Sequence, residues 1–298
     1  MSLQPLLFSV ESLTPTTTIP PLKSQFLKWI GNKQRFAHEI IGYFPRDFKM
    51  YYEPFIGSGA ILGTLFPKRG VAGDSLQPLI QIWQTLQQQP EIVEEWYLER
   101  WLQFHGEDRT VAYNAIKRSF NVQPNPADLL FLSRSCYGGV VRFRKDGYMS
   151  TPCGVHDPIH PSRFVERVRV WHERVQGVEF LHDDFEVTMK LAQKGDLVYC
   201  DPPYSDTQSI IYGSQQFSLM RLLSVIEDCK SRGVYVALSI DGTKHNGRKR
   251  PQLQIPAGLF EQEIVVNCGR SMLKRFQMTG QTLEDEVVTD RLLLSYSP

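Results

Sequence analysis

Short apolar runs alternate with helix-like stretches along most of the chain, and this alternation constrains the fold more than any other feature. The apolar runs predict buried strands at residues 50–52, 71–72, 178–181, 197–200, 234–240, 263–266 and 292–296. Helical spacing of apolar residues predicts helices after Gly31 and over 218–229. Strands that alternate with helices favour the α/β class, with a mainly parallel sheet covered on both faces.

One interval is too long for this alternation. About a hundred residues separate the predicted strand that ends near Asp74 from the one that starts near Val178, whereas a single crossover needs roughly a dozen. The chain has 298 residues, which is enough for about two domains. We therefore expect an N-terminal arm over 1–21, a main domain assembled from 22–80 and 165–298, and a mainly helical domain inserted at 81–164.

The total charge hides local sorting. Lys and Arg number 33 against 32 Asp and Glu, and a net charge of +1 gives by itself no reason to expect a polyanionic partner. Within the long interval, residues 91–108 are rich in acidic side chains, whereas residues 134–174 are rich in basic ones. The basic side chains there are Arg134, Arg142, Arg144, Lys145, Arg163, Arg167, Arg169 and Arg174.

Cysteine usage and hydropathy indicate a soluble, cytoplasmic protein without a membrane partner. No run approaches the roughly 18 apolar residues of a membrane span, and the N-terminus lacks the features of a signal peptide. The cysteines lie far apart without a CxxC pair, which predicts free thiols rather than a zinc site or a disulfide framework. They are Cys136, Cys153, Cys200, Cys229 and Cys268.

The run Asp201-Pro202-Pro203-Tyr204 directly follows the predicted strand at 197–200. Ligands of open α/β sheets bind at the carboxyl ends of the strands, where this run is expected. Prolines stiffen the loop, and an ionised Asp201 together with the Pro202 carbonyl can accept both hydrogens of an amino group. Tyr204 offers a flat face for stacking a base. The alternative is a stiff loop whose Asp caps a helix.

A second run, Glu53-Pro54-Phe55-Ile56-Gly57-Ser58-Gly59, also lies between a predicted strand and a helix-like stretch. Its glycines allow a tight turn and close approach of the backbone to a ligand. A lone GxG more often marks a plain turn. Asp74, at the end of the next predicted strand, shifts the balance toward a nucleoside-binding site, because a carboxylate there can accept from ribose hydroxyls.

A third run, Phe26-Leu27-Lys28-Trp29-Ile30-Gly31-Asn32-Lys33, says little by composition alone. Together, however, the three runs resemble the Dam-type, alpha-group DNA adenine-N6 methyltransferases, whose motif order is FxxWxGxK, ExFxGxG, a target-recognition domain and then DPPY. The resemblance extends from Phe26 to Tyr296. It implies a Rossmann-like methyltransferase sheet formed by 22–80 and 165–298, and a target-recognition domain with a β-hairpin at 81–164.

The resemblance also implies S-adenosylmethionine as methyl donor, S-adenosylhomocysteine as product and no metal. By its motifs the cofactor contacts are Trp29, Gly31, Lys33, Glu53, Phe55, Gly57 and Gly59, with Asp74 on the ribose and Asp184 and Phe185 on the adenine. The family usually has a second glycine where this chain has Asn32. A metal site around His182-Asp183-Asp184 is disfavoured, because no further ligands lie nearby in the sequence.

For DNA, the resemblance implies a hairpin within 132–143 that enters the duplex. Arg142 falls at the position of a base-reading arginine, and Tyr137 at that of an aromatic that inserts into the base stack. Arg134, Arg144 and Lys145 are expected on phosphates. Tyr212 and Phe217 match aromatics that cover the flipped base. The cluster Lys244, His245, Arg248, Lys249 and Arg250 is either a phosphate-binding loop or a solvated surface.

The expected function is site-specific methylation of adenine N6 on a base flipped out of double-stranded DNA, with Asp201, Pro202, Pro203 and Tyr204 as the catalytic run. A cognate restriction endonuclease is a candidate partner. The alternatives are a cytosine-N4 DNA methyltransferase and a catalytically silent DNA-binding regulator on the same fold. Pro152-Cys153 resembles the nucleophile of cytosine-C5 methyltransferases, but methylation of an amine needs no thiolate, so Cys153 is expected to be structural.

Overall fold

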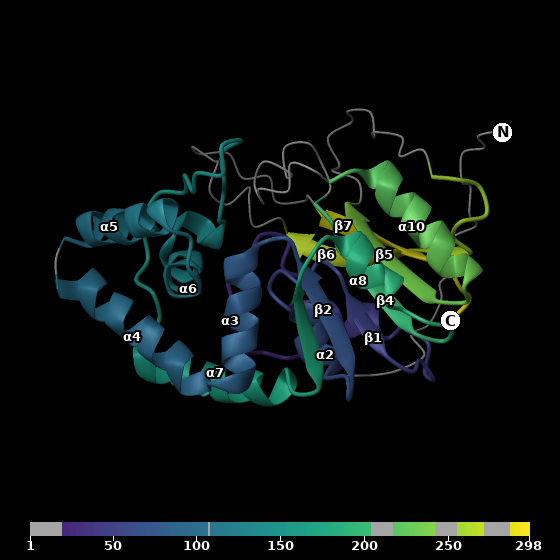
Figure 1. The fold of residues 1–298 in the computed structure, drawn as a ribbon, viewed down its shortest axis with the longest axis horizontal. Helices are drawn as coiled ribbons and strands as arrows, with labels where there is room; N and C mark the ends of the chain where they lie inside the picture. The colour runs from purple at the N-terminus through teal and green to yellow at the C-terminus, as the bar shows by residue number, and fades with distance from the viewer. Residues whose placement is uncertain (1–19, 107, 204–216, 242–254, 271–286) are drawn as a thin grey trace.

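The computed structural model describes residues 20–106, 108–203, 217–241, 255–270 and 287–298. Its central sheet has seven strands in the order β3-β2-β1-β4-β5-β7-β6 (Figure 1). Strands β3, β2, β1, β4 and β5 run parallel, and β7 runs antiparallel to both β5 and β6. The strand bounds are β1 Tyr51–Glu53, β2 Gly70–Asp74, β3 Val178–His182, β4 Leu197–Cys200, β5 Tyr235–Asp241, β6 Gln262–Arg270 and β7 Val287–Leu294.

The predicted α/β class and mainly parallel sheet are confirmed. Each predicted apolar run lies in or overlaps one of these strands, because the runs at the centre of the sheet are buried on both faces and carry few polar side chains. The helix predicted at 218–229 is α10, Leu219–Ser231. The helix predicted after Gly31 is short: α1 covers only Ala37–Ile41, and turns precede it.

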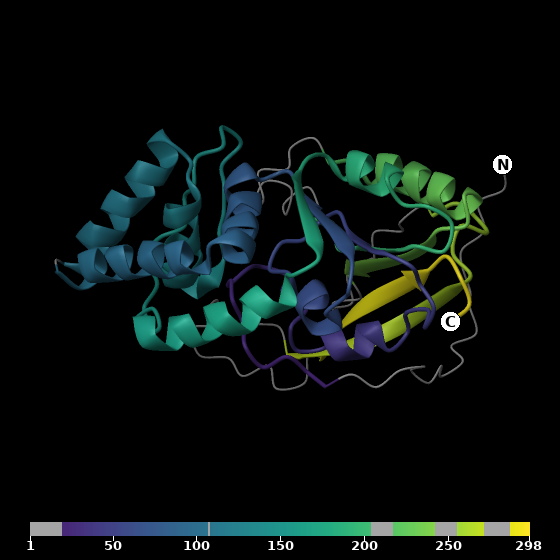
Figure 2. The same cartoon turned by 60° about the horizontal axis from the view of Figure 1, so that its bottom comes forward.

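Helices cover both faces of the sheet (Figure 2). Helix α8 (Phe185–Lys190) packs with α10 on one face, and α1 packs with α2 (Ala60–Leu65) on the other. Successive side chains of β4 point to opposite faces of the sheet and belong to two hydrophobic cores. Val198 and Cys200 pack toward α8 and α10, whereas Tyr199 packs toward α1 and α2.

The long interval between β2 and β3 folds into helices that extend to one side of the sheet (Figure 1). They are α3 Gln77–Gln88, α4 Pro90–Gly106, α5 Arg109–Val122, α6 Pro126–Ser135, the 3-10 turn η1 Tyr137–Gly139 and α7 Pro161–Arg174. Capping residues set where several of them begin. Asp108 accepts from the backbone N–H groups of Thr110 and Val111 at the start of α5, for example.

These helices share one hydrophobic core with the sheet. Tyr97 and Phe131 from the long interval belong to the same buried cluster as Trp83, Trp171 and the sheet-facing side chains of α2. The expected boundaries at 80/81 and 164/165 fall inside α3 and α7. Helices α3 and α7 therefore run across the two expected boundaries.

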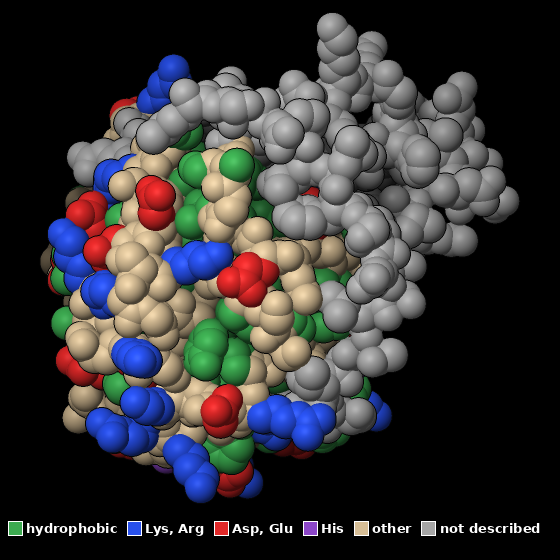
Figure 3. All heavy atoms as spheres, turned by 90° about the vertical axis from the view of Figure 1, so that its right-hand side faces the viewer, with side chains coloured by type: hydrophobic (Ala, Val, Ile, Leu, Met, Phe, Trp, Pro, Cys, Tyr) green, Lys and Arg blue, Asp and Glu red, His purple; other side chains and the backbone are tan. Residues whose placement is uncertain are grey.

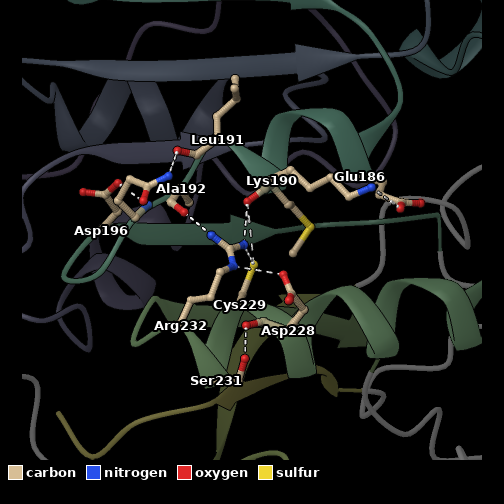
Figure 4. A network of polar contacts seen from close by, with 11 residues as sticks. Glu186, Lys190, Leu191, Ala192, Asp196, Asp228, Cys229, Ser231 and Arg232 are labelled. Atoms are coloured by element: carbon tan, nitrogen blue, oxygen red, sulfur yellow. Dashed lines mark hydrogen bonds and ion pairs between the residues drawn. The ribbon is translucent and has the colours of Figure 1, made fainter.

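A polar network at the amino-terminal end of β4 joins α8 to α10 (Figure 4). The Arg232 guanidinium donates to the carbonyl oxygens of Met189, at 3.3 Å, and Ala192, and pairs with Asp228 at 2.9 Å. The Cys229 thiol donates to the Met189 carbonyl at 3.7 Å. These contacts hold the amino-terminal end of β4, which is opposite to the carboxyl ends of the parallel strands.

Candidate functional site

Polar residues meet where the parallel strands end. Glu53 closes β1, Asp74 closes β2, and Asp201 follows β4 directly. Because β1 pairs in parallel with both β2 and β4, these three carboxyl groups lie at one edge of the sheet. This is the edge at which ligands of open α/β sheets bind.

Lys33 lies over this edge with its ammonium group buried. Its Nζ lies 3.0 Å from Oδ1 of Asp201 and 3.3 Å from Oδ2 of Asp290. Burial lowers the pKa of Lys33, but the carboxylates of Asp201 and Asp290 outweigh it and hold the pKa well above its usual value. Lys33, expected at the cofactor, is thus in direct contact with the expected catalytic carboxylate.

Asp290 is a site residue that the sequence analysis did not identify. It lies in β7 and is almost completely buried. The available signal was a single carboxylate two positions before a run of leucines, since a carboxylate in a buried strand is rarely without a partner.

Glu53 is buried beneath Asp201. Its Oε2 accepts from the Tyr51 hydroxyl at 2.7 Å and from the backbone N–H of Leu62 at 3.0 Å. Burial raises the pKa of Glu53 to about 8, and the nearby charge of Asp201 acts in the same direction. The Glu53 carboxyl is therefore mostly protonated at neutral pH, and it ties β1 to α2.

The turn after β1 has the close-approach geometry that its glycines predict. Gly57 has φ +45°, and a Cβ placed on it would lie 3.1 Å from Cδ1 of Trp29. Gly59 has φ +63° and is the N-cap residue of α2. Only glycine adopts such angles without strain, so the turn depends on both residues.

Asp74 holds this turn from the end of β2. Its Oδ2 accepts from the Gly57 N–H at 3.3 Å, and its Oδ1 accepts from the Leu76 N–H at 3.0 Å. Burial raises the pKa of Asp74 to about 6, although these two hydrogen bonds oppose the change. A carboxylate can accept about four hydrogen bonds, so these two leave capacity for a ligand hydroxyl.

Asn32 makes a local contact that a second glycine could not make. Its Oδ1 accepts from the Gln34 N–H at 2.6 Å. Its Nδ2 is a buried donor without a partner among the described residues. Next to it, Gly31 adopts φ +71°.

Three aromatic rings form a cluster above the ends of β1 and β3. Phe55 and Phe185 stack with centroids 5.3 Å apart, and Phe217 packs edge-on against Phe55 at 5.9 Å. Arg221, which the sequence analysis did not identify, lies 4.4 Å over the Phe185 ring. It also pairs with Asp184, which caps α8 by accepting from the Glu186 N–H.

The remaining expected site residues fall into two groups. Pro202 is buried and Pro203 partly buried beside Asp201. Tyr204, Tyr212 and the basic cluster at 244–250 lie outside the described residues, as does the arm up to residue 19. No group of three metal-ligating side chains occurs in the described parts of the chain.

Residues 136–154 double back on themselves beside α6. Phe143 bridges to Met149 and Cys136 to Cys153, both in antiparallel fashion. The side chains of Arg142, Arg144 and Lys145 are exposed, and that of Tyr137 is partly buried. The described cysteines Cys136, Cys153, Cys200 and Cys229 are free thiols.

The predicted phosphate contact of Arg134 does not agree with its position in the structure. Arg134 was expected on phosphate, but it is 3% exposed, and its guanidinium donates to the backbone carbonyls of Gln25 and Phe26. Burial lowers its pKa to about 10. It therefore anchors the segment before Trp29 to α6, and its guanidinium is not exposed for the expected phosphate contact.

The basic residues of α7 are also partly turned inward. Arg167 donates to the Gln25 carbonyl, and Arg174 donates to the Gly63 carbonyl at 2.9 Å. Helix α7 packs along the acidic helix α4, and the charge of Arg169 acts on Glu94. The basic composition of 134–174 thus overstates the exposed basic surface. Figure 3 shows the opposite side of the molecule, away from these helices, where both acidic and basic side chains lie on the described part of the surface.

The seven-stranded α/β sheet, with a glycine turn and acidic groups at one edge, is consistent with the fold of S-adenosylmethionine-dependent methyltransferases. Residues 29–251 match the model of the D12 class N6 adenine-specific DNA methyltransferases, and the chain belongs to this family. No helix among the described residues is long and apolar enough to span a membrane.

Several curated proteins are similar over most of their length. The retron Ec67 DNA adenine methylase of Escherichia coli is 32% identical over 231 residues, which cover 74% of this chain and 78% of that protein. The DNA adenine methylase of Haemophilus influenzae is 26% identical, over 81% of this chain and 90% of that protein. A type II methyltransferase of Lactococcus lactis subsp. cremoris is 28% identical, over 82% and 95%.

Proposed function

We propose that this DNA adenine methyltransferase transfers a methyl group from S-adenosylmethionine to N6 of an adenine flipped out of duplex DNA, with Asp201 as the central catalytic residue. The observation that carries the proposal is the position of Asp201, directly after β4 and 3.0 Å from the buried Lys33. Family membership supplies the reaction class.

The cofactor site is proposed at the Gly57–Gly59 turn. The left-handed glycine turn at Gly57, a buried unpaired donor on Asn32, and the acceptor Asp74 fit a ligand with a carboxylate at one end and ribose hydroxyls in the middle. Phe55, Phe185 and Phe217 fit the face of an adenine ring. When bound, S-adenosylmethionine supplies a methyl group already activated on a sulfonium centre. Trp29, Gly31, Lys33, Glu53 and Asp184 complete the proposed site.

The target amine is a poor nucleophile, because its lone pair is delocalised into the adenine ring. Asp201 and the Pro202 carbonyl accept its two hydrogens and stabilise the positive charge that develops on nitrogen. Pro203 stiffens the loop, which keeps both acceptors in place. Tyr204 stacks on the flipped base. These residues therefore position the amine for direct transfer of the methyl group, and the reaction needs no covalent intermediate.

Target recognition is proposed for 81–164, with the hairpin expected within 132–143 and the main domain formed by 22–80 and 165–298. Arg142 reads a base edge, Tyr137 fills the stack that the flipped base leaves, and Arg144 and Lys145 contact phosphates. Their exposed or partly exposed side chains support these roles. The name of the Lactococcus relative supports a cognate restriction endonuclease as a candidate partner.

Long-read sequencing of DNA from a methylation-deficient host that expresses the protein tests this function. We expect N6-methyladenine at one short sequence and none with Asp201→Ala, which should still bind DNA within about threefold of wild type. Methylated cytosine would identify the cytosine-N4 alternative, and full activity of Asp201→Ala would refute the mechanism. The partner is tested by digesting the methylated DNA with restriction endonucleases that recognise the methylated sequence, because a cognate enzyme should cut the unmethylated DNA only.

A further inference from the structure

Asp290 belongs to none of the motifs found in the sequence. It contacts Lys33, which also contacts Asp201. In the sheet, Cys200 lies opposite Leu238, and Leu292 lies opposite Ser239. Alternation along the strands therefore places Asp201 and Asp290 on the same face, with β5 between them. Lys33 spans this gap, at 3.0 Å from one carboxylate and 3.3 Å from the other.

The charges in this group do not cancel. Lys33 carries one positive charge, and Asp201 and Asp290 carry one negative charge each. The Glu53 carboxyl below them is mostly protonated near pH 7, and burial raises the pKa values of Tyr51 and Cys200 far above that range. The Tyr199 hydroxyl also interacts with Lys33 and adds no charge when protonated. Among the side chains that the structure describes in this group, one net negative charge remains beside the amine that the proposed reaction makes positive.

With Asp201 and Lys33 alone, the same group would be neutral and would stabilise the developing positive charge less effectively. We propose that Asp290 is a positioning residue, which balances the charge of Lys33 so that Asp201 keeps its negative charge available to the target amine. The inference rests on the proposed role of Asp201, and it adds a residue on β7 to that site.

The direct test is Asp290→Asn, which removes the charge at nearly constant volume. We expect the single-turnover rate of methyl transfer to fall about tenfold, a typical effect of disturbed electrostatic stabilisation, while KM for DNA and for S-adenosylmethionine changes less than about twofold. Asp290→Glu should restore most of the rate. In a Lys33→Gln background, Asp290→Asn should add less than about twofold, because its effect passes through Lys33.

The pH profile separates this role from a purely structural one. Loss of a neighbouring negative charge favours ionisation of Asp201, so the acid limb of the rate profile should move to lower pH in Asp290→Asn. Glu263→Gln is the matched control. Glu263 pairs with Arg291 at 2.8 Å across β6 and β7, and Arg291 points to the opposite face from Asp290. This variant should keep the wild-type rate and acid limb.

The outcomes distinguish this inference from the proposed function. If wild type methylates adenine and Asp201→Ala does not, the function stands. Asp290→Asn with the wild-type rate and an unmoved acid limb then overturns the role of Asp290 alone. Should Asp290→Asn unfold below the assay temperature, Asp290→Ser removes the same charge with a smaller side chain and is judged by the same two criteria.

Discussion

At the scale of single residues, the carboxyl groups at the sheet edge differ in protonation because their surroundings differ. Asp201 faces the ammonium of Lys33, whereas Glu53 has only hydrogen-bond donors and lies in the core. Burial raises the pKa of Glu53 to about 8 and that of Asp74 to about 6. Neighbouring carboxyl groups can thus take different roles: the proposed catalytic carboxylate Asp201 pairs with a cation, whereas Glu53 is mostly neutral near pH 7 and ties β1 to α2.

Glu53 should make stability depend on pH. Its pKa rises from 4.5 to about 8 on folding, so the folded state holds the extra proton between these values and stability falls as pH rises through them. The loss approaches about 1.4 kcal/mol per pH unit. Glu53→Gln keeps an acceptor for Tyr51 and Leu62 and should flatten the dependence above about pH 6, where Asp74 contributes less. Urea unfolding at a series of pH values measures this.

The control for this prediction is Glu99→Gln. Glu99 is 72% exposed and pairs only at the surface with Arg100, so its removal should leave the pH dependence of the free energy of unfolding unchanged. Equal slopes for wild type and Glu53→Gln would show that Glu53 is ionised in the folded protein.

Gly57→Ala should weaken cofactor binding more than it destabilises the fold. The new Cβ would combine a left-handed φ with a 3.1 Å contact to Trp29, so the ring must move away from the turn. Gly258→Ala imposes a similar φ of +79° with nothing within 4 Å. We expect both variants to lose roughly 1–2 kcal/mol of stability, and only Gly57→Ala to lose affinity for S-adenosylmethionine by about tenfold in calorimetry. Equal affinities would remove Gly57 from the cofactor site.

At the scale of elements, residues 140–151 present side chains from a firmly held backbone. The Arg142 N–H donates to Oγ1 of Thr151 at 2.8 Å, and its carbonyl accepts from the Ser150 N–H at 2.9 Å. Tyr113 from α5 donates to the Thr151 carbonyl at 2.9 Å. Such a backbone can hold a long side chain in register with base edges without an extended sheet.

Arg142→Ala and Arg144→Ala should therefore have different effects on DNA binding. Loss of Arg142 should relax discrimination at one base pair by about tenfold or more, with a smaller effect on overall affinity. Loss of Arg144 should weaken binding to all sequences equally and make the salt dependence shallower. Binding assays on a set of single-base variants at several salt concentrations measure both. A uniform loss for Arg142→Ala would identify it as a phosphate contact.

At the scale of the whole molecule, the long helical interval and the sheet are joined through one core. Trp171 of α7 reaches α2 so closely that a Cβ on Gly63 would lie 2.5 Å from its ring, and Trp83 of α3 stacks near Phe180 of β3. Buried Arg134 adds a polar link to the segment before Trp29. The parts are therefore not expected to unfold independently.

We predict a single calorimetric transition for the protein, with calorimetric and van't Hoff enthalpies that agree within about 10%. Trp171→Ala should lower the midpoint of that transition and keep it single, because the ring supports both parts of the core, at a cost of about 3–5 kcal/mol. Two separated transitions in wild type would show that 81–164 folds on its own.

The sequence by itself determined the elements and the motifs. Apolar runs predicted the strands, because a strand buried on both faces can carry few polar side chains. The Asp201 run and the Gly57–Gly59 turn were found because their residue types follow strands at fixed positions. Charge composition was a poorer guide, since a sum over residues 134–174 cannot distinguish exposed Arg142 from buried Arg134.

Only the tertiary structure decided which side chains meet. Asp290 lies 257 positions from Lys33 in the chain, and no local spacing predicts their contact. The contact exists because β7, near the end of the chain, lies antiparallel between β5 and β6. This position brings Asp290 to the edge of the sheet where β1 and β4 end. Motif spacing is a local property of the chain, whereas the charge balance around Asp201 depends on the order of strands in the sheet.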